Sequence, residues 1–197
     1  MTFQLSNRGP GTWLAALALC AFSGGALAQE APHVKFTTTA GSFVIEVYPD
    51  KAPKTVENFL QYVKDKHYDG TIFHRVIDNF MVQGGGFDAK YNQKPTRPPI
   101  PLEANNGLKN DVGTIAMART SNPNSATSQF FINVKDNAML NAPSPDGFGY
   151  TVFGKVVSGS EVIQKIKSSP TGAGGPFQSD APKQTILINS VTLEKKP

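Results

Sequence analysis

The sequence predicts a mainly β fold, a closed or nearly closed antiparallel barrel with two short helices. Three observations predict it: short strand-like runs recur along the chain, only two segments have helical periodicity, and glycine (18) and proline (15) are plentiful. With 197 residues, 39% of them hydrophobic and 17% charged, the chain has the composition of a globular protein with a sizeable core. We therefore expect one domain, with no internal repeat.

Residues 1–28 have the pattern of a secretory signal peptide. Arg8 supplies a positive charge, residues 13–22 form a short apolar run, and Ala26-Leu27-Ala28 is a small-x-small cleavage site. The run is shorter than the about 20 residues that a membrane span needs, which disfavours a transmembrane anchor. We therefore expect cleavage, export and no membrane segment in the mature protein. A short linker at 29–33 and one domain at 34–194 would follow.

The only cysteine, Cys20, lies inside this predicted signal peptide. A lipid anchor at Cys20 is the less favoured alternative, because Leu19 stands where a small residue is expected. After cleavage the chain would have no disulfide, no thiol nucleophile and no cysteine–zinc site.

The first elements are a hairpin and a helix. Residues 34–39 and 41–48 are strand-like and are joined by a short connection that contains glycine. In residues 50–65 the apolar positions switch to helical spacing: Val56, Phe59, Leu60 and Val63. We expect Asp50 to cap this helix and Pro53 to lie in its first turn.

The rest of the chain alternates strands with turns. Residues 71–77 and 80–83 are strand-like, and the glycines at 84–86 that follow predict a tight turn or bulge with positive φ. Residues 88–101 hold four prolines and predict a long surface loop. Further strands are expected at 113–118, 129–134, 150–157 and 185–193, and a second helix at 160–167.

Several function classes lack their signatures. The formal charge of +4 is scattered rather than clustered, which disfavours nucleic acid as a partner. There is no G-x-S-x-G run, and the glycines at 84–86 lack the lysine of a phosphate-binding loop. The three histidines, His33, His67 and His74, are dispersed, so we expect no metal site.

Two segments interleave polar and aromatic residues in a way that is unusual for plain strands: 73–85 and 117–133. In the second, alternation places Gln129 and Phe131 on one face and Phe130 on the other. An apolar pocket with a few polar groups is the usual composition of a binding site. Taken alone, however, each of these aromatic residues is more often part of a core.

Three sequence blocks carry a family resemblance. The run F-H-R-V-I-x-x-F-M-V-Q-G-G at 73–85 resembles the cyclophilin signature, and S-Q-F-F-I at 128–132 and V-F-G-K-V at 152–156 resemble two further cyclophilin blocks in the expected order. The similarity covers residues 34–193. The proline-rich loop, the N-S-A-T-S-Q-F-F run and the signal peptide make the chain similar to the bacterial, periplasmic branch.

The resemblance implies an eight-stranded antiparallel β-barrel capped by two α-helices, and peptidyl-prolyl cis/trans isomerase activity without cofactor or metal. It implies a monomer whose partners are proline-containing segments of unfolded or exported proteins. By the same resemblance Arg75 is the catalytic residue. The implied substrate-binding residues are Phe80, Met81, Gln83, Ala118, Arg119, Thr120, Gln129, Phe131, Met139, Leu140 and Tyr150.

The chemistry of the imide bond gives Arg75 a specific task. Rotation about C–N costs about 18–20 kcal/mol because the bond has double-bond character. In the twisted transition state the proline nitrogen regains a lone pair, which a permanently charged guanidinium can hydrogen-bond. This interaction is absent from the planar ground state, so it stabilises the transition state selectively. The reaction needs no nucleophile, acid or base.

The chain departs from the best-known cyclophilin pattern in the groove. Met139 stands where many members have tryptophan, and Tyr150 where many have histidine. Methionine lacks the indole donor, so we expect weak binding of cyclosporin. There is also extra sequence at 142–146, from which no effect is derived. A proline-binding chaperone that does not depend on turnover is the main alternative function, and a small-ligand barrel is a third that no motif supports.

Overall fold

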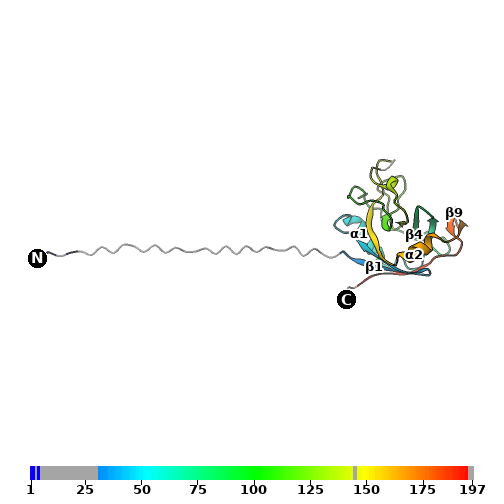
Figure 1. The fold of residues 1–197 in the computed structure, drawn as a ribbon, viewed down its shortest axis with the longest axis horizontal. Coiled ribbons are helices and arrows are strands. Elements are labelled where there is room, and N and C mark those ends of the chain that lie inside the picture. The colour runs from blue at the N-terminus through cyan, green and yellow to red at the C-terminus, as the bar shows by residue number, and fades with distance from the viewer. Residues whose placement is uncertain (3, 5–30, 144–145, 195–197) are drawn as a thin grey trace.

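The computed structural model describes residues 1, 2, 4, 31–143 and 146–194 (Figure 1). The expected signal peptide, apart from residues 1, 2 and 4, and its cleavage site lie outside the described residues, as do residues 29 and 30 of the expected linker. Among the described residues, no helix is long and apolar enough to cross a membrane.

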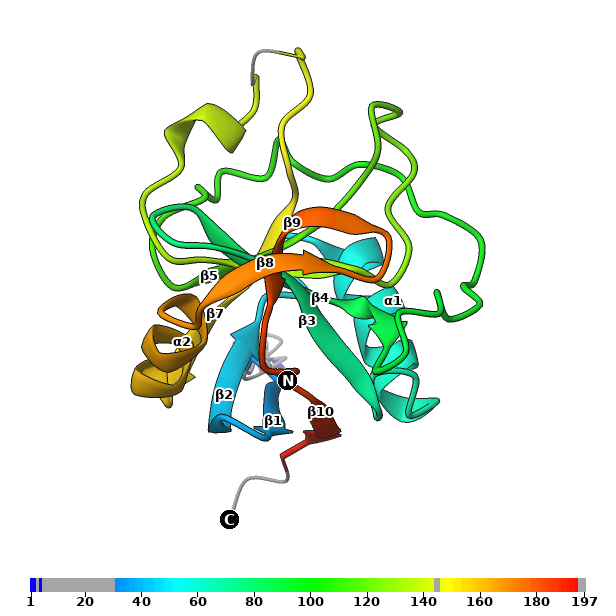
Figure 2. The same ribbon diagram turned by 90° about the vertical axis from the view of Figure 1, so that its right-hand side faces the viewer.

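Eight strands of the described chain form one antiparallel sheet in the order β10-β1-β2-β7-β5-β6-β4-β3. Its edges meet: the Gly70 amide donates to the Ile188 carbonyl (2.9 Å) and the Phe73 amide to the Ile186 carbonyl (3.0 Å). The sheet is therefore a nearly closed eight-stranded barrel (Figure 2). The strands are β1 (His33–Thr38), β2 (Gly41–Val47), β3 (Thr71–Ile77), β4 (Met81–Asp88), β5 (Thr114–Met117), β6 (Phe130–Asn133), β7 (Val152–Ser158) and β10 (Ile188–Leu193).

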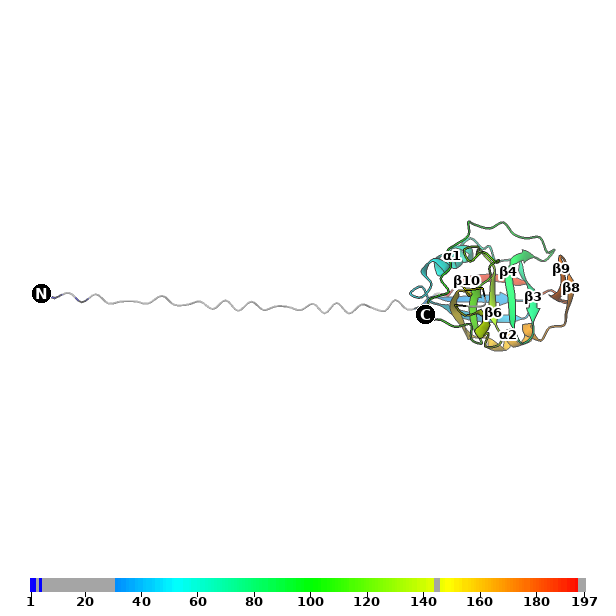
Figure 3. The ribbon, with the colours of Figure 1, turned by 90° about the horizontal axis from the view of Figure 1, so that it is seen from above.

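Helices α1 (Pro53–Lys64) and α2 (Ser160–Lys167) lie at opposite sides of the barrel (Figures 2 and 3). Each buries one apolar face, which in α2 consists of Val162, Ile163 and Ile166. Both helices were predicted from their apolar spacing, and α2 has the predicted bounds.

The start of α1 differs from the prediction. Asp50 does not cap it, because the helix begins after Ala52 and no side chain of the N-cap residue bonds to it. Instead Glu103, from the connection between β4 and β5, accepts hydrogen bonds from the amides of Lys54 (3.1 Å) and Thr55 (2.8 Å). A carboxylate at a helix N-terminus satisfies free amides and complements the helix dipole. The cap therefore comes from 48 residues away in sequence, where local pattern gives no signal of it.

Apolar residues divide between two clusters. The larger fills the barrel interior and contains stacked rings, such as Phe36 and Phe43 with centroids 4.7 Å apart. The smaller lies outside it and consists of Met81, Ala116, Phe131 and Val152. Neighbouring Phe130 and Phe131 fall in different clusters, as alternation along β6 predicts. The smaller cluster is the base of the candidate site.

The remaining differences are local. β1 begins at His33, one residue inside the expected linker. The glycines at 84–86 lie within β4 rather than after it, and Gly85 has φ +84° where the β3–β4 pairing is irregular, as expected of a bulge. Two elements were not predicted: a two-stranded hairpin, β8 (Thr171–Gly174) and β9 (Phe177–Pro182), and the short 3₁₀ helix η1 (Ala138–Leu140).

Candidate functional site

A single row of paired residues crosses five strands of the barrel. Arg75 on β3 pairs with Gln83 on β4, which pairs with Phe131 on β6. Phe131 pairs with Ala116 on β5, and Ala116 with Val152 on β7. Directly paired residues project from the same face of a sheet. The strand register therefore places the Arg75 and Gln83 side chains beside the smaller apolar cluster.

This face carries a cavity of about 400 Å³. It brings together nine of the twelve predicted site residues: Arg75, Phe80, Met81, Gln83, Ala118, Arg119, Phe131, Leu140 and Tyr150. Among them, Met81 and Phe131 are buried, at 2% and 4% exposed. The lining is thus an apolar floor with a few polar groups around it, the composition expected of a ligand site.

Three predicted residues do not line the cavity. Gln129 reaches it through Gln83, whose Nε2 donates to Gln129 Oε1 (3.0 Å). Thr120 turns away, with its hydroxyl donating to Ser125 Oγ (2.8 Å). Met139 lies on η1 and is 58% exposed. The chain departs from the best-known cyclophilin pattern at Met139 and Tyr150, and of these two residues only Tyr150 lines the cavity.

Gly86 makes room for the Gln83–Gln129 pair. A Cβ atom at Gly86 would lie only 2.5 to 2.6 Å from Gln129 Cγ, Cδ and Nε2. Real Cβ atoms do not approach so closely, so the Gln129 side chain can lie here only because residue 86 has none. The glycine run of the signature therefore shapes the polar edge of the cavity.

Arg75 lies near the carboxylate of Asp180 on β9. Arg75 Nε lies 4.0 Å from Asp180 Oδ2, with the two side chains 39% and 35% exposed. Asp180 has φ +66°, a left-handed conformation that aspartate tolerates better than most residues. Sequence reasoning missed Asp180 because the 171–182 segment has neither regular alternation nor helical spacing. Two glycines in β8 weaken its strand signal.

His74, next to Arg75, points away from the cavity. It is 1% exposed, and its ring packs against Phe177 (centroids 5.2 Å apart) and Phe87 (4.8 Å). Burial, and secondarily the Arg75 charge, lower the His74 pKa to about 4. It is therefore neutral at pH 7, and its contact with Phe177 attaches the β8–β9 hairpin to β3.

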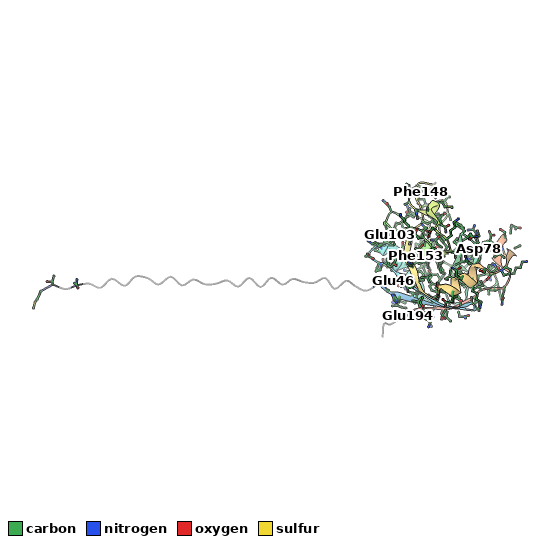
Figure 4. All side chains as sticks on the ribbon, viewed as in Figure 1. Glu46, Asp78, Glu103, Phe148, Phe153 and Glu194 are labelled. Atoms are coloured by element: carbon green, nitrogen blue, oxygen red, sulfur yellow. The ribbon has the colours of Figure 1, made fainter. Side chains whose placement is uncertain are left out.

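Arg119 is a buried part of the wall. Its side chain is 1% exposed, pairs with Asp146 (2.5 Å) and donates from Nε to the Gly149 carbonyl (2.9 Å). The guanidinium also lies 4.4 Å from the centre of the Tyr150 ring, a cation–π geometry. Arg119 thus holds the segment that carries Asp146, the last residue of the extra sequence, and Phe148, which is labelled at the upper edge of the domain in Figure 4.

The arrangement has two permanent cations, Arg75 and the Arg119 guanidinium held by Asp146, together with two side-chain amides and an apolar floor. Among the residues that the structure describes, no three His, Cys, Asp or Glu side chains are grouped so that they could hold a metal ion. Fold and site together define a β-barrel protein whose cavity is suited to hold a small apolar ring beside a guanidinium.

Comparisons with known proteins agree with this class. Residues 33–193 match the family of cyclophilin type peptidyl-prolyl cis-trans isomerases. The chain is 56% identical over 162 residues to peptidyl-prolyl cis-trans isomerase cyp18 of Streptomyces antibioticus, covering 81% of this chain and 97% of that protein. It is 54% identical over 164 residues to peptidyl-prolyl cis-trans isomerase B of Escherichia coli, covering 82% and 99%.

A crystal structure of a Cryptosporidium parvum cyclophilin type isomerase, in the presence of the dipeptide Ala-Pro, is similar with TM-score 0.68 and 27% identity. The similarity covers 83% of this chain and 99% of that one. The chain belongs to the cyclophilin-type peptidyl-prolyl cis-trans isomerase family. It is an isomerase with the predicted mainly β barrel fold.

Proposed function

We propose that this isomerase acts on X-Pro segments at the cavity around Arg75, and that it assists the folding of exported proteins in the periplasm. The observation that carries the assignment of the cavity is the position of Arg75. Its guanidinium lines the cavity beside the apolar floor, and the other polar side chains of the lining are Gln83, Arg119 and Tyr150. None of these is a general base or an activated nucleophile at neutral pH. Imide rotation is a reaction that needs neither.

In this proposal the proline ring lies on the apolar floor and stays fixed while the preceding carbonyl group turns. Phe80, Met81, Phe131 and Leu140 supply apolar surface around the ring. An apolar surround also strengthens a hydrogen bond from Arg75 to the imide nitrogen, because it excludes water. The cavity thus acts on the one atom whose electronic state changes on rotation.

The peptide main chain on either side of the proline has polar partners nearby. Gln83 and Gln129 are already joined by a hydrogen bond, so each has a defined orientation and unused amide groups. The main chain near Arg119 offers a further edge beside Ala118. The Arg119 guanidinium itself is engaged with Asp146, Gly149 and Tyr150, so we assign it to the wall and not to direct substrate binding.

The isomerisation assay uses a short proline peptide with the purified wild type and Arg75→Ala and Arg75→Lys variants. Arg75→Ala should lower kcat/KM by about 10²–10³, like the loss of one preorganised donor. The kcat/KM of Arg75→Lys should lie between those of the wild type and Arg75→Ala, because a lysine keeps the charge but not the planar set of donors. Near-normal turnover by Arg75→Ala would remove Arg75 from the mechanism.

The cellular part of the proposal rests on the signal-like sequence at 1–28 and needs a separate test. Expression in a Gram-negative host, followed by fractionation and N-terminal sequencing, should find the protein in the periplasm with Gln29 as its first residue. A cytoplasmic, uncleaved product would contradict this part and leave the isomerase activity untouched. A monomer is expected in size-exclusion chromatography.

A further inference from the structure

Three asparagines lie buried behind the walls of the cavity. Asn110, Asn133 and Asn137 are 1%, 0% and 1% exposed. They come from the loop before β5, from the end of β6 and from the residue before η1. Buried amides are costly unless they are hydrogen-bonded, so their partners show what they hold together.

The bonds form a continuous chain from one wall of the cavity to the other. Asn137 Nδ2 donates to the Phe80 carbonyl (2.8 Å) and to Asn133 Oδ1 (2.7 Å). Asn133 Nδ2 in turn donates to Asn110 Oδ1 (3.2 Å). Asn110 Nδ2 donates to the carbonyls of Leu140 (3.1 Å) and Tyr150 (3.4 Å). This series of hydrogen bonds ends on both sides at main-chain carbonyls, which can only accept. The donor and acceptor sides of each asparagine amide are therefore fixed.

The three carbonyls at the ends of this chain belong to cavity-lining residues outside the β-strands. Phe80 lies in the turn between β3 and β4, Leu140 on η1, and Tyr150 before β7. The strand register that positions Arg75, Gln83 and the floor therefore does not reach these walls. Direct main-chain bonds link Phe80 to Val134 and Tyr150 to Leu140. The Leu140 amide donates to the Asn137 carbonyl (2.8 Å) and the Asn137 amide to the Asn110 carbonyl (2.8 Å). The Asn137 side chain therefore joins Phe80 to the segment that carries Leu140.

A contribution to stability does not by itself explain why residue 137 is an asparagine. Its Oδ1 atom is buried and has no hydrogen-bond partner among the described residues. An unpaired buried acceptor carries a desolvation cost that an apolar side chain of similar size would avoid. The two donors on Asn137 Nδ2 must therefore confer something that an apolar residue cannot, and their partners are Phe80 and Asn133.

We propose that Asn137 and Asn110 are positioning residues of the isomerase, which set the spacing between Phe80 on one wall and Leu140 and Tyr150 on the other. This inference rests on the proposed function of the cavity. The walls contact the proline ring in the planar and the twisted state alike. Loosening them therefore removes uniform binding, which raises KM and leaves kcat nearly unchanged.

The test uses Asn137→Val, which removes both donors of Asn137 Nδ2. With a short proline peptide, Asn137→Val should raise KM by about fivefold to tenfold, with kcat within about twofold of wild type. The thermal midpoint of the variant is measured alongside.

Thr71→Val is the matched control. Its hydroxyl is buried and donates to the Tyr68 carbonyl (2.6 Å), at the end of β3 away from Arg75. The control loses one buried hydrogen bond and stability, but its KM should equal that of wild type. A purely structural role of Asn137 would make Asn137→Val behave like Thr71→Val.

The outcomes separate this inference from the proposed function. An unchanged KM in Asn137→Val, with activity lost in Arg75→Ala, overturns the positioning role and leaves the proposed site intact. Retained activity in Arg75→Ala overturns the site itself. If Asn137→Val does not unfold cooperatively, Asn110→Ser decides, since serine is too short to reach the Leu140 and Tyr150 carbonyls. An unchanged KM in that variant also overturns the inference.

Discussion

Gly86→Ala should lower activity by displacing a neighbouring side chain while leaving the fold intact. Gly86 has no positive φ, so alanine fits its backbone. The added Cβ would lie 2.5 Å from Gln129 Cγ and 2.6 Å from Gln129 Nε2. A glutamine side chain can rotate away at little cost, whereas the β4 backbone cannot move without disturbing its pairing with β6. Gln129 should therefore swing out and lose its bond to Gln83.

The size of the effect follows from that bond. The Gln83–Gln129 hydrogen bond joins two neutral groups at 3.0 Å in a partly buried place. Such bonds contribute about 0.5–1.5 kcal/mol. Because about 1.4 kcal/mol corresponds to a factor of ten, kcat/KM should fall about two- to twelvefold. The free energy of unfolding should change by less than about 1 kcal/mol, since alanine also restricts the unfolded chain.

A double-mutant cycle tests the route of the effect. The peptide assay is run on Gly86→Ala, Gln129→Ala and the double variant. If alanine at 86 acts by displacing Gln129, it should have no further effect once Gln129 is truncated. Gly172→Ala is the control, because its Cβ would approach only the flexible Lys183 side chain. Additive losses, or full activity in Gly86→Ala, would refute the reasoning.

Four further outcomes are expected. Glu103→Ala should lower the free energy of unfolding by about 1–2 kcal/mol in urea titrations, because it removes the remote cap of α1. Asp180→Asn should change kcat/KM by less than about fivefold, since its pairing with Arg75 at 4.0 Å is partly exposed. Folding lowers the His74 pKa from its ordinary value of 6.5 to about 4, so stability should be full above pH 6.5 and should fall by up to about 3 kcal/mol toward pH 4. Urea titrations across this range should show a smaller fall in His74→Phe. Cyclosporin should bind weakly because Met139 lacks an indole donor, and a titration giving low-nanomolar affinity would contradict this.

The strands and helices were largely predictable because their signals are local. Alternation and helical spacing located the eight barrel strands and both helices to within about three residues, except that β4 extends five residues beyond the predicted 80–83. The opposite faces of Phe130 and Phe131 followed from the period of a strand. Closure into a barrel was expected from the number of short strands, but the count of eight came from the resemblance and not from the pattern.

The parts that sequence reasoning missed depend on contacts between distant segments. The cap on α1 comes from Glu103, and the partner of Arg75 from Asp180, 105 positions further along the chain by residue number. The β8–β9 hairpin has little regular alternation, and its attachment through Phe177 to His74 is visible only in three dimensions. None of these contacts has a spacing rule that a single sequence could reveal.

The site combines two kinds of support with different consequences for substitution. Its floor is fixed by strand pairing, and Met81 and Phe131 are almost fully buried, so changes there disturb the barrel surface itself. Its walls are loops held by side-chain bonds: the asparagine chain behind Phe80, Leu140 and Tyr150, and Arg119 with Asp146 beside Tyr150. Loops tolerate sequence change better than strands do. Substrate preference can therefore change through the walls while Arg75 and the floor keep the geometry that imide rotation requires.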